Sequence, residues 1–203
     1  DCRPSPRHHA LVRVTCVVTL VTKVGFYCQD AAAPWSGIFV HAPYDALTLA
    51  LQPGDEVSVR DAYVDEELGS TQLEVAAADD VEILQRYVTV GPLLVDAGAL
   101  GSFAEREAAR CLASAEPYEG LLVRITNASL TLVDGYVSVA DGSGGTTLLG
   151  TTAGRFDAAD ALVRFRASGA AAADVVGVGR TGFRCENSAG ANQGAIEDVL
   201  ECL

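Results

Sequence analysis

The feature that most constrains the fold of this chain is an internal duplication. The run GFYCQDAAAPWSGIFV, at residues 25–40, has the same layout as GYVSVADGSGGTTLL, at residues 135–149. In both, a β-prone run leads into a turn rich in small residues and then into a second β-prone run. Such self-similarity indicates that one structural unit occurs twice. A chain of 203 residues has room for two domains of ordinary size, about 100 residues each.

The first half has the element order of an OB barrel, which is five short strands with one small helix between the third and the fourth. Apolar and β-branched residues predict strands, and helical spacing predicts the helix, at residues 11–24, 26–29, 38–41, 45–51 (helix), 56–60 and 71–75. The second half repeats the plan, with strands at residues 120–132, 136–139, 146–149 and 174–178 and a short helix and strand within 156–165.

Between the halves, Ser102 and Glu105 have the spacing of a capping box and predict a helix at residues 102–115. We therefore predict an all-β fold of two tandem OB-like five-stranded barrels with short connecting helices. The predicted parts are an extended N-terminal arm with two prolines, a first barrel, a linker with a short helix, and a second barrel with a cysteine-containing tail, at residues 1–10, 11–87, 88–116 and 117–203.

The composition bears on location and partners. The formal charge is −13, and Lys and Arg are sparse and scattered, so a nucleic-acid partner is disfavoured, because phosphate neutralisation supplies most nucleic-acid affinity. No apolar run reaches the roughly 18 residues of a membrane span. The chain contains no Met, which suggests a processed, exported product. An extracellular or cell-surface location is expected.

Cysteine usage fits this location. An even number of cysteines without a C-x-x-C pair favours disulfides over a zinc site, and the candidates are Cys2, Cys16, Cys28, Cys111, Cys185 and Cys202. Six cysteines allow 15 pairings. We favour Cys185 with Cys202, and Cys2 with either Cys16 or Cys28. Asn127 opens an Asn-Ala-Ser sequon and is a glycosylation candidate.

Ordered motifs resemble a known family. They are VVT at 17–19, GFYCQD at 25–30, SGIFV at 36–40, PGDEV at 53–57, GSTQL at 69–73, AEPYEGLLVRI at 115–125, Asn127, and Asp141-Gly142. In this order they resemble the OB-fold-like domains that accompany bacterial extracellular nucleases. Asp61 departs from the family, which tends to have Gly there, and the catalytic domain of those nucleases is absent. The resemblance implies the fold and secretion, without the nuclease activity.

Potential catalytic and ligand motifs are weak. Residues 177–182 spell G-x-G-x-x-G but lack the following helix that a dinucleotide site requires. His8 and His9 would point to opposite faces of a strand, and His41 has no nucleophile-elbow motif to serve. The turn at residues 141–145 lacks the acids of a calcium loop. We expect no catalytic residue, no metal ligand and no cofactor.

Two functions remain open. The favoured hypothesis is a non-enzymatic, secreted structural protein that self-associates, for example as a filament subunit whose N-terminal arm adds a strand to a neighbour. The alternative is an accessory module of a secreted nuclease or other hydrolase that binds nucleic acid or glycans on the usual OB surface.

Overall fold

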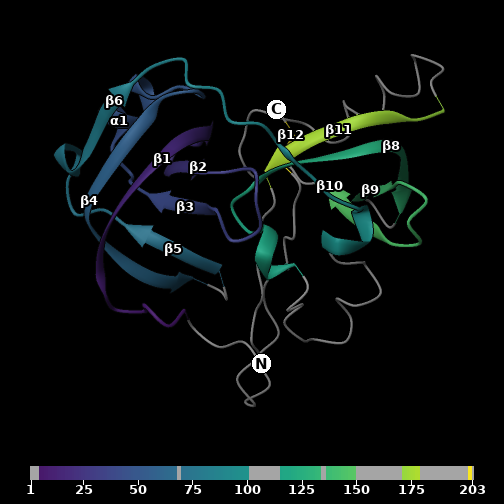
Figure 1. Ribbon diagram of the computed structural model, residues 1–203, viewed down its shortest axis with the longest axis horizontal. Coiled ribbons are helices and arrows are strands. Elements are labelled where there is room, and N and C mark those ends of the chain that lie inside the picture. The colour runs from purple at the N-terminus through teal and green to yellow at the C-terminus, as the bar shows by residue number, and fades with distance from the viewer. Residues whose placement is uncertain are drawn as a thin grey trace.

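The computed structural model describes residues 5–67, 70–100, 115–133, 136–149, 171–178 and 201–202. Within these ranges the chain consists mainly of strands, with one α-helix and three 3-10 helices (Figure 1). The all-β, OB-like prediction is confirmed. The predicted helix at 102–115 falls almost entirely outside the described residues, as does the predicted element at 156–165.

The first unit is a closed five-stranded barrel. Its elements are β1 (Leu11–Val21), β2 (Gly25–Gln29), β3 (Gly37–His41), α1 (Asp45–Ala50), β4 (Glu56–Glu67) and β5 (Ser70–Glu74). The strand order is β1-β2-β3-β5-β4, and β4 pairs again with β1 to close the ring. β3 and β5 are parallel, and the other pairs are antiparallel. The 3-10 helix η1 (Ala78–Asp80) leads to β6 (Val81–Gln85), which extends the sheet beyond β4.

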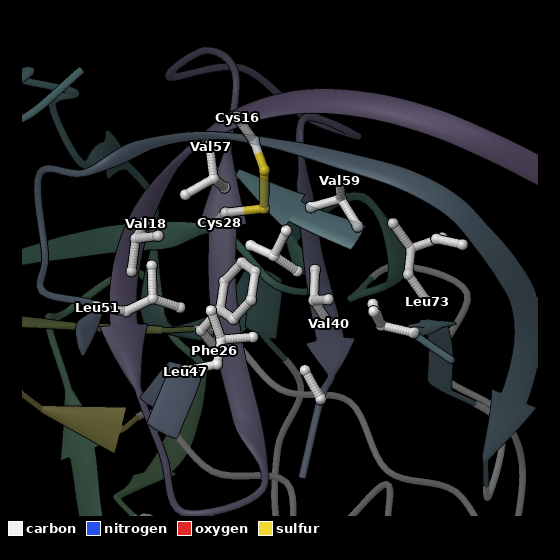
Figure 2. Close-up of a cluster of buried hydrophobic side chains, with 14 of the residues drawn as sticks. Cys16, Val18, Phe26, Cys28, Val40, Leu47, Leu51, Val57, Val59 and Leu73 are labelled. Atoms are coloured by element: carbon white, nitrogen blue, oxygen red, sulfur yellow. A yellow bond between two sulfur atoms is a disulfide. The ribbon is translucent and has the colours of Figure 1, made fainter. Parts of the chain in front are cut away.

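The core of this barrel surrounds Phe26, which is fully buried (Figure 2). Alternate residues of β1 and β4 point inward, as period-two alternation requires, and α1 contributes Leu47 at the end of the barrel where β3 finishes. Complete burial of an apolar side chain of this size stabilises a fold by about 1.5–3 kcal/mol. The core therefore accounts for the regular spacing of apolar residues in the sequence.

β4 is longer than the predicted strand and contains a bulge. Its pairing with β1 shifts register between Val12 and Val14, where Arg60 and Asp61 lie opposite Arg13. Asp61 has a φ of 50°, in the left-handed region that Gly adopts most readily.

The second unit repeats the start of this plan. Its elements are β7 (Leu93–Leu94), η2 (Ala97–Leu100), η3 (Glu116–Tyr118), β8 (Leu122–Val133), β9 (Tyr136–Ala140), β10 (Thr146–Leu149), β11 (Ala173–Val178) and β12 (Glu201–Cys202). β8, β9 and β10 form a meander, and β11 pairs antiparallel with the first half of β8, as β4 does with β1. Among the described residues this unit is a sheet that does not close.

The N-terminal segment lies against its own barrel. Residues 6–9 form a turn, although an extended arm was predicted. The His9 N–H donates to the carbonyl of Val64, whose N–H donates to the carbonyl of Ala10. The Ser5 N–H donates to the Glu66 carboxylate at 2.7 Å. Residues 5–10 thus bind the end of β4 in the same chain.

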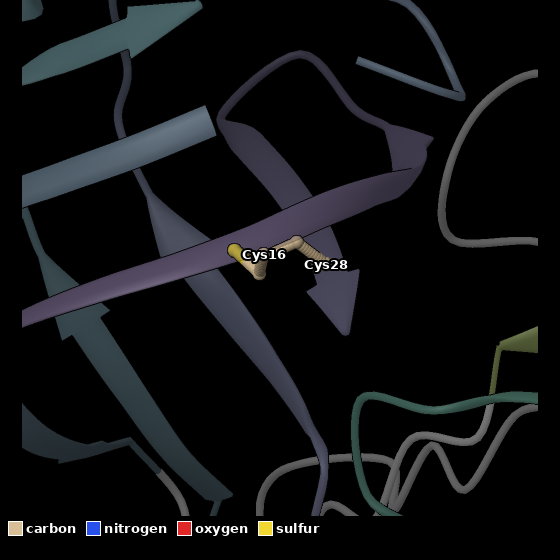
Figure 3. Close-up of a disulfide and its surroundings, with 2 residues drawn as sticks. All are labelled: Cys16 and Cys28. Atoms are coloured by element: carbon tan, nitrogen blue, oxygen red, sulfur yellow. A yellow bond between two sulfur atoms is a disulfide. The ribbon is translucent and has the colours of Figure 1, made fainter. Parts of the chain in front are cut away.

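One disulfide corrects the predicted pairing. Cys16 on β1 is bonded to Cys28 on β2, with a Cα–Cα distance of 5.6 Å (Figure 3). The two strands are antiparallel neighbours, and both side chains face the barrel core. A bond from Cys2 to either residue was therefore the wrong expectation. Cys2, Cys111 and Cys185 lie outside the described residues, and Cys202 lies on β12.

Candidate functional site

The surface that OB barrels usually present to ligands is covered in this chain. That surface is the outer face of the second and third strands. Here Tyr27 on β2 and Phe39 on β3 pack with Leu122 and Val178 of the second unit, and Tyr27 is only 4% exposed. Figure 1 shows the two units side by side. The aromatic residues of this face therefore hold the two units together.

Polar contacts fix the same interface. Gln29, at the end of β2, is fully buried. Its Oε1 accepts from the Leu122 N–H at 2.7 Å, and its Nε2 donates to the Gly91 carbonyl at 3.1 Å. A Cβ at Gly37 would lie 2.4 Å from the carbonyl carbon of Gly120, so the two backbones touch there. This close packing joins the barrel and the second sheet into one body.

A strand edge of the barrel is left open. β2 pairs with β1 only from Val17 onward, whereas β4 pairs with β1 from Leu11 to Val17. Among the described residues, no strand lies on the other side of residues 12–16 of β1. Successive residues of a strand direct their N–H and C=O groups to alternate edges. The Val18 N–H donates to the carbonyl of Asp55, just before β4, so the main-chain groups of Val18 face β4. Thr15 and Arg13 lie an odd number of residues from Val18, so their main-chain groups face the opposite, open edge.

A hollow of about 410 Å³ lies beside this edge. It is at the end of the barrel where β3 begins, opposite the end that α1 covers. Its apolar wall consists of inward-facing residues from β1, β3, β4 and β5, namely Val12, Val14, Ile38, Val64 and Leu73. Its volume is within the range of ligand pockets, about 300–1,000 Å³. An apolar side chain of a ligand can enter here from the open edge.

The rim of the hollow carries one aromatic and two basic side chains. Trp35, the only Trp of the chain, is 72% exposed. Arg7 and Arg13 also line the hollow, and neither guanidinium forms an ion pair within the part of the chain that is described. Asp30 is the acidic residue among the described lining residues. The Trp35 ring can therefore stack on a ligand, and the guanidinium groups of Arg7 and Arg13 can bind an anionic group.

The backbone of Trp35 is held by the second unit. Its φ is 67°, a left-handed conformation that costs an ordinary residue roughly 1–2 kcal/mol. The Trp35 N–H donates to the Pro117 carbonyl at 2.7 Å, and the Asp30 N–H donates to the Ser36 carbonyl at 3.1 Å. These bonds fix the loop between β2 and β3 and place Trp35 at the rim.

The histidines lie differently from the prediction. His8 and His9 were expected on opposite faces of a strand, but they occupy the turn and their rings stack with centroids 3.6 Å apart. His8 Nε2 lies 3.4 Å from the Asp65 carboxylate, and His9 Nδ1 contacts the Tyr63 hydroxyl. Asp65 lies on β4. These contacts hold the N-terminal turn.

His41 pairs with a carboxylate. Its Nδ1 lies 2.7 Å from Glu74, whose other oxygen accepts from Gln72 at 2.7 Å. Within the described residues, none of its contacts reaches a hydroxyl or thiol. Those residues also contain no group of three or more His, Cys, Asp or Glu placed to hold a metal ion.

Two acidic side chains at loops have shifted pKa values. Burial would raise the pKa of Asp141, but hydrogen bonds from Ser143 and from the Ala97 N–H lower it overall. The Ala97 bond measures 2.8 Å and attaches the turn after β9 to η2, a structural role. Burial, and then the charge of Glu66, raise the pKa of Glu116 beside the unit interface.

The remaining predicted positions are dispersed. Asn127 is exposed on β8 with a φ of 53°, and its N–H lies 3.4 Å from the Asp174 carboxylate. Gly177 and Val178 of the glycine motif belong to β11, and the rest of that motif lies outside the described residues. Trp35 and Arg13 were not predicted as site residues. A lone Trp between Pro34 and Ser36 in a small-residue loop was the available signal.

Comparison with known proteins gives a structural likeness without a matching family. No family model and no curated protein matches this chain. Among solved structures, the crystal structure of the p204 HINb domain is similar with a TM-score of 0.35 and 14% identity, over 71% of this chain and 77% of that one. No helix among the described residues is both long and apolar enough to cross a membrane.

Proposed function

We propose that this chain is a non-enzymatic, secreted interaction module that binds an extended peptide of a partner protein at the open edge of β1. The observation that carries the proposal is the main-chain edge of Arg13 and Thr15, on which no strand of the described residues lies, beside the apolar hollow. An extended peptide that joins such an edge gains main-chain hydrogen bonds, and its alternate side chains enter the pocket.

The covered face of the barrel favours this function over the accessory role. Nucleic acids and oligosaccharides bind OB barrels on the face of the second and third strands, and here Tyr27 and Phe39 are packed against the second unit. The formal charge of −13 further disfavours a nucleic acid, because an acidic surface repels phosphate at long range.

The proposal keeps strand addition, which the sequence suggested, but changes the donor. Residues 5–10 bind β4 of their own chain, so they are not available to a neighbour without breaking those bonds. The Cys16–Cys28 disulfide supports an extracellular location, since disulfides persist mainly in oxidising compartments.

Trp35 makes the test direct, because it is the single Trp and lines the hollow. The protein is titrated with an acetylated, amidated peptide of alternating Thr and Val, with oligothymidylate, and with neutral and acidic oligosaccharides. We expect the peptide alone to shift Trp35 emission to shorter wavelength, in a saturable manner. No shift with the peptide, together with a response to the oligonucleotide or an oligosaccharide, would refute the proposal.

A further inference from the structure

The second unit contains an occupied equivalent of the open edge. β8 begins with Leu-Val-Arg-Ile-Thr at residues 122–126, and β1 begins with Leu-Val-Arg-Val-Thr at residues 11–15. Along this motif, β1 pairs antiparallel with β4, and β8 pairs antiparallel with β11. Farther along each strand, β1 pairs with β2, and β8 pairs with β9. Arg124 is thus the counterpart of Arg13.

On β8, the edge opposite β11 is filled by the linker strand β7. Leu93 pairs with Val123 and Leu94 with Arg124, in parallel orientation. The Val95 N–H donates to the Arg124 carbonyl at 3.0 Å. The same edge of β1 has no strand on it within the described residues. The chain itself therefore shows what kind of segment this edge accepts.

The side chains of the linker segment alternate between the core and solvent. Leu93 packs against the core of the second unit, and Val95 is buried in it, whereas Leu94 is 64% exposed. The hollow beside β1 offers an apolar wall to two such inward residues. The middle residue of the bound segment would lie beside the side chain of Arg13, as Leu94 lies beside Arg124.

We infer that the partner peptide runs parallel to the first half of β1 and carries an apolar–acidic–apolar triplet; the inference rests on the proposed function. The two apolar residues enter the hollow, as Leu93 and Val95 enter the second core. The acidic residue pairs with Arg13, and Arg7 lies on the same rim. Charge complementarity favours the acid, because neither guanidinium has an ion-pair partner among the described residues.

The neighbouring acids do not remove this preference. Asp30 lines the hollow and Asp61 lies opposite Arg13 on β4, but neither carboxylate forms an ion pair with an Arg of the rim among the described residues. Glu66 is already engaged, since its Oε1 accepts from the Ser5 N–H and from the Thr71 hydroxyl, each at 2.7 Å. A second copy of this chain is a poor donor, because its own residues 93–94 are paired with its own β8.

The test uses synthetic peptides with the sequence of residues 90–97, Val-Gly-Pro-Leu-Leu-Val-Asp-Ala, and Trp35 emission of the whole chain. The position of Leu94 is Glu, Leu or Lys in three versions. Cross-strand pairs of opposite charge predict that the Glu peptide binds roughly twofold to fivefold more tightly than the Leu peptide, and the Lys peptide less tightly. In Arg13→Gln, the three affinities should converge while binding of the Leu peptide persists.

The main-chain geometry is tested by methylating single amides of the Glu peptide. Methylation at the position of Val95 removes the donor to Arg13 and should abolish binding, whereas methylation at the position of Leu94 should leave it. Peptide exchange into β8 is disfavoured, because the tethered linker has a high effective concentration. Equal binding of both methylated peptides, or of the Glu and Lys peptides, would overturn the inference.

The two proposals fail differently. A Trp35 shift with the Thr-Val peptide, without the expected order among the linker peptides, would refute the inference and leave strand addition standing. The absence of a shift with every peptide would refute both.

Discussion

Gln29 offers the sharpest test of how the two units are joined. Its amide is fully buried, and each of its polar atoms is used: Oε1 accepts from the Leu122 N–H, and Nε2 donates to the carbonyls of Ala31 and Gly91 at 3.2 and 3.1 Å. Gln29→Glu keeps the shape of the side chain but places an oxygen against two carbonyl oxygens. The substitution therefore changes the hydrogen bonding without creating a cavity.

The expected cost follows from the proton that the new carboxyl must carry. A carboxyl that is ionised in the unfolded chain and forced to stay neutral when buried costs about 1.4 kcal/mol for each pH unit above its ordinary pKa of about 4.3. The neutral acid has one donor where the amide had two, so one lost hydrogen bond adds about 1 kcal/mol. We expect Gln29→Glu to lower the free energy of unfolding by about 5 kcal/mol at pH 7 and about 1 kcal/mol at pH 4.

Urea unfolding of Gln29→Glu and the unchanged protein, at several pH values, measures this difference. Gln85→Glu is the matched control, since it adds the same charge at an exposed position of β6. Surface substitutions of this kind usually change stability by less than about 0.5 kcal/mol. A loss below about 1 kcal/mol at pH 7, or a loss independent of pH, would contradict the assigned hydrogen bonds of Gln29.

Three further predictions concern the interface and the barrel. Gly37→Ala should lower the free energy of unfolding, measured with urea, by about 2 kcal/mol or more, because the new Cβ meets backbone atoms. Gly91→Ala should not lower it, because a Cβ there meets nothing within 4 Å. Replacing Cys16 and Cys28 together with Ala should cost about 3 kcal/mol in urea unfolding, as expected from the small loop that the disulfide closes; an unchanged midpoint would contradict the bond. Glu116→Gln should raise the melting temperature at pH 7: because the pKa of Glu116 is raised, the folded state loses this proton at a higher pH than the unfolded chain does, so its stability falls as pH rises above the ordinary value of 4.5. The gain should vanish below that value, and a constant gain would contradict the shift.

The barrel was predictable because its information is local. Alternation of apolar residues gives β4 a buried and an exposed face, and the internal duplication indicates a second unit of the same kind. The first five residues of β1 and β8 were the strongest form of that duplication. Their match identifies equivalent edges, which comparison of the later turns did not reveal.

The interface had a sequence signal of a different kind. Residues 16–21 of β1 are buried on both faces, and so is the whole of β2. Loss of alternation in an antiparallel strand indicates that a second layer covers its outer face. The adjacent apolar residues Val17–Val18 and Leu20–Val21 are therefore a sequence signal that the outer face of the barrel is covered.

Other features depend on where elements stop, which local patterns do not specify. Among the described residues, no strand covers this edge of β1, because β2 ends at Gln29, before it reaches Thr15. The disulfide pairing depends on the register of β1 against β2, and the turn at His8 and His9 depends on contacts with the end of β4. Each is a tertiary property that no single segment encodes.

The two units are therefore more than a tandem of independent barrels. The second unit covers the usual ligand face of the first, and by the same contact it holds the loop that carries Trp35. Without the Pro117 carbonyl, the left-handed conformation of Trp35 would lose the hydrogen bond that offsets its cost. An edge strand beside a mobile loop could be closed by that loop, whereas a fixed loop keeps the hollow accessible. Packing at Tyr27 and Gln29 thus covers the usual ligand face of the barrel and leaves the peptide site that we propose, at the edge of β1, accessible.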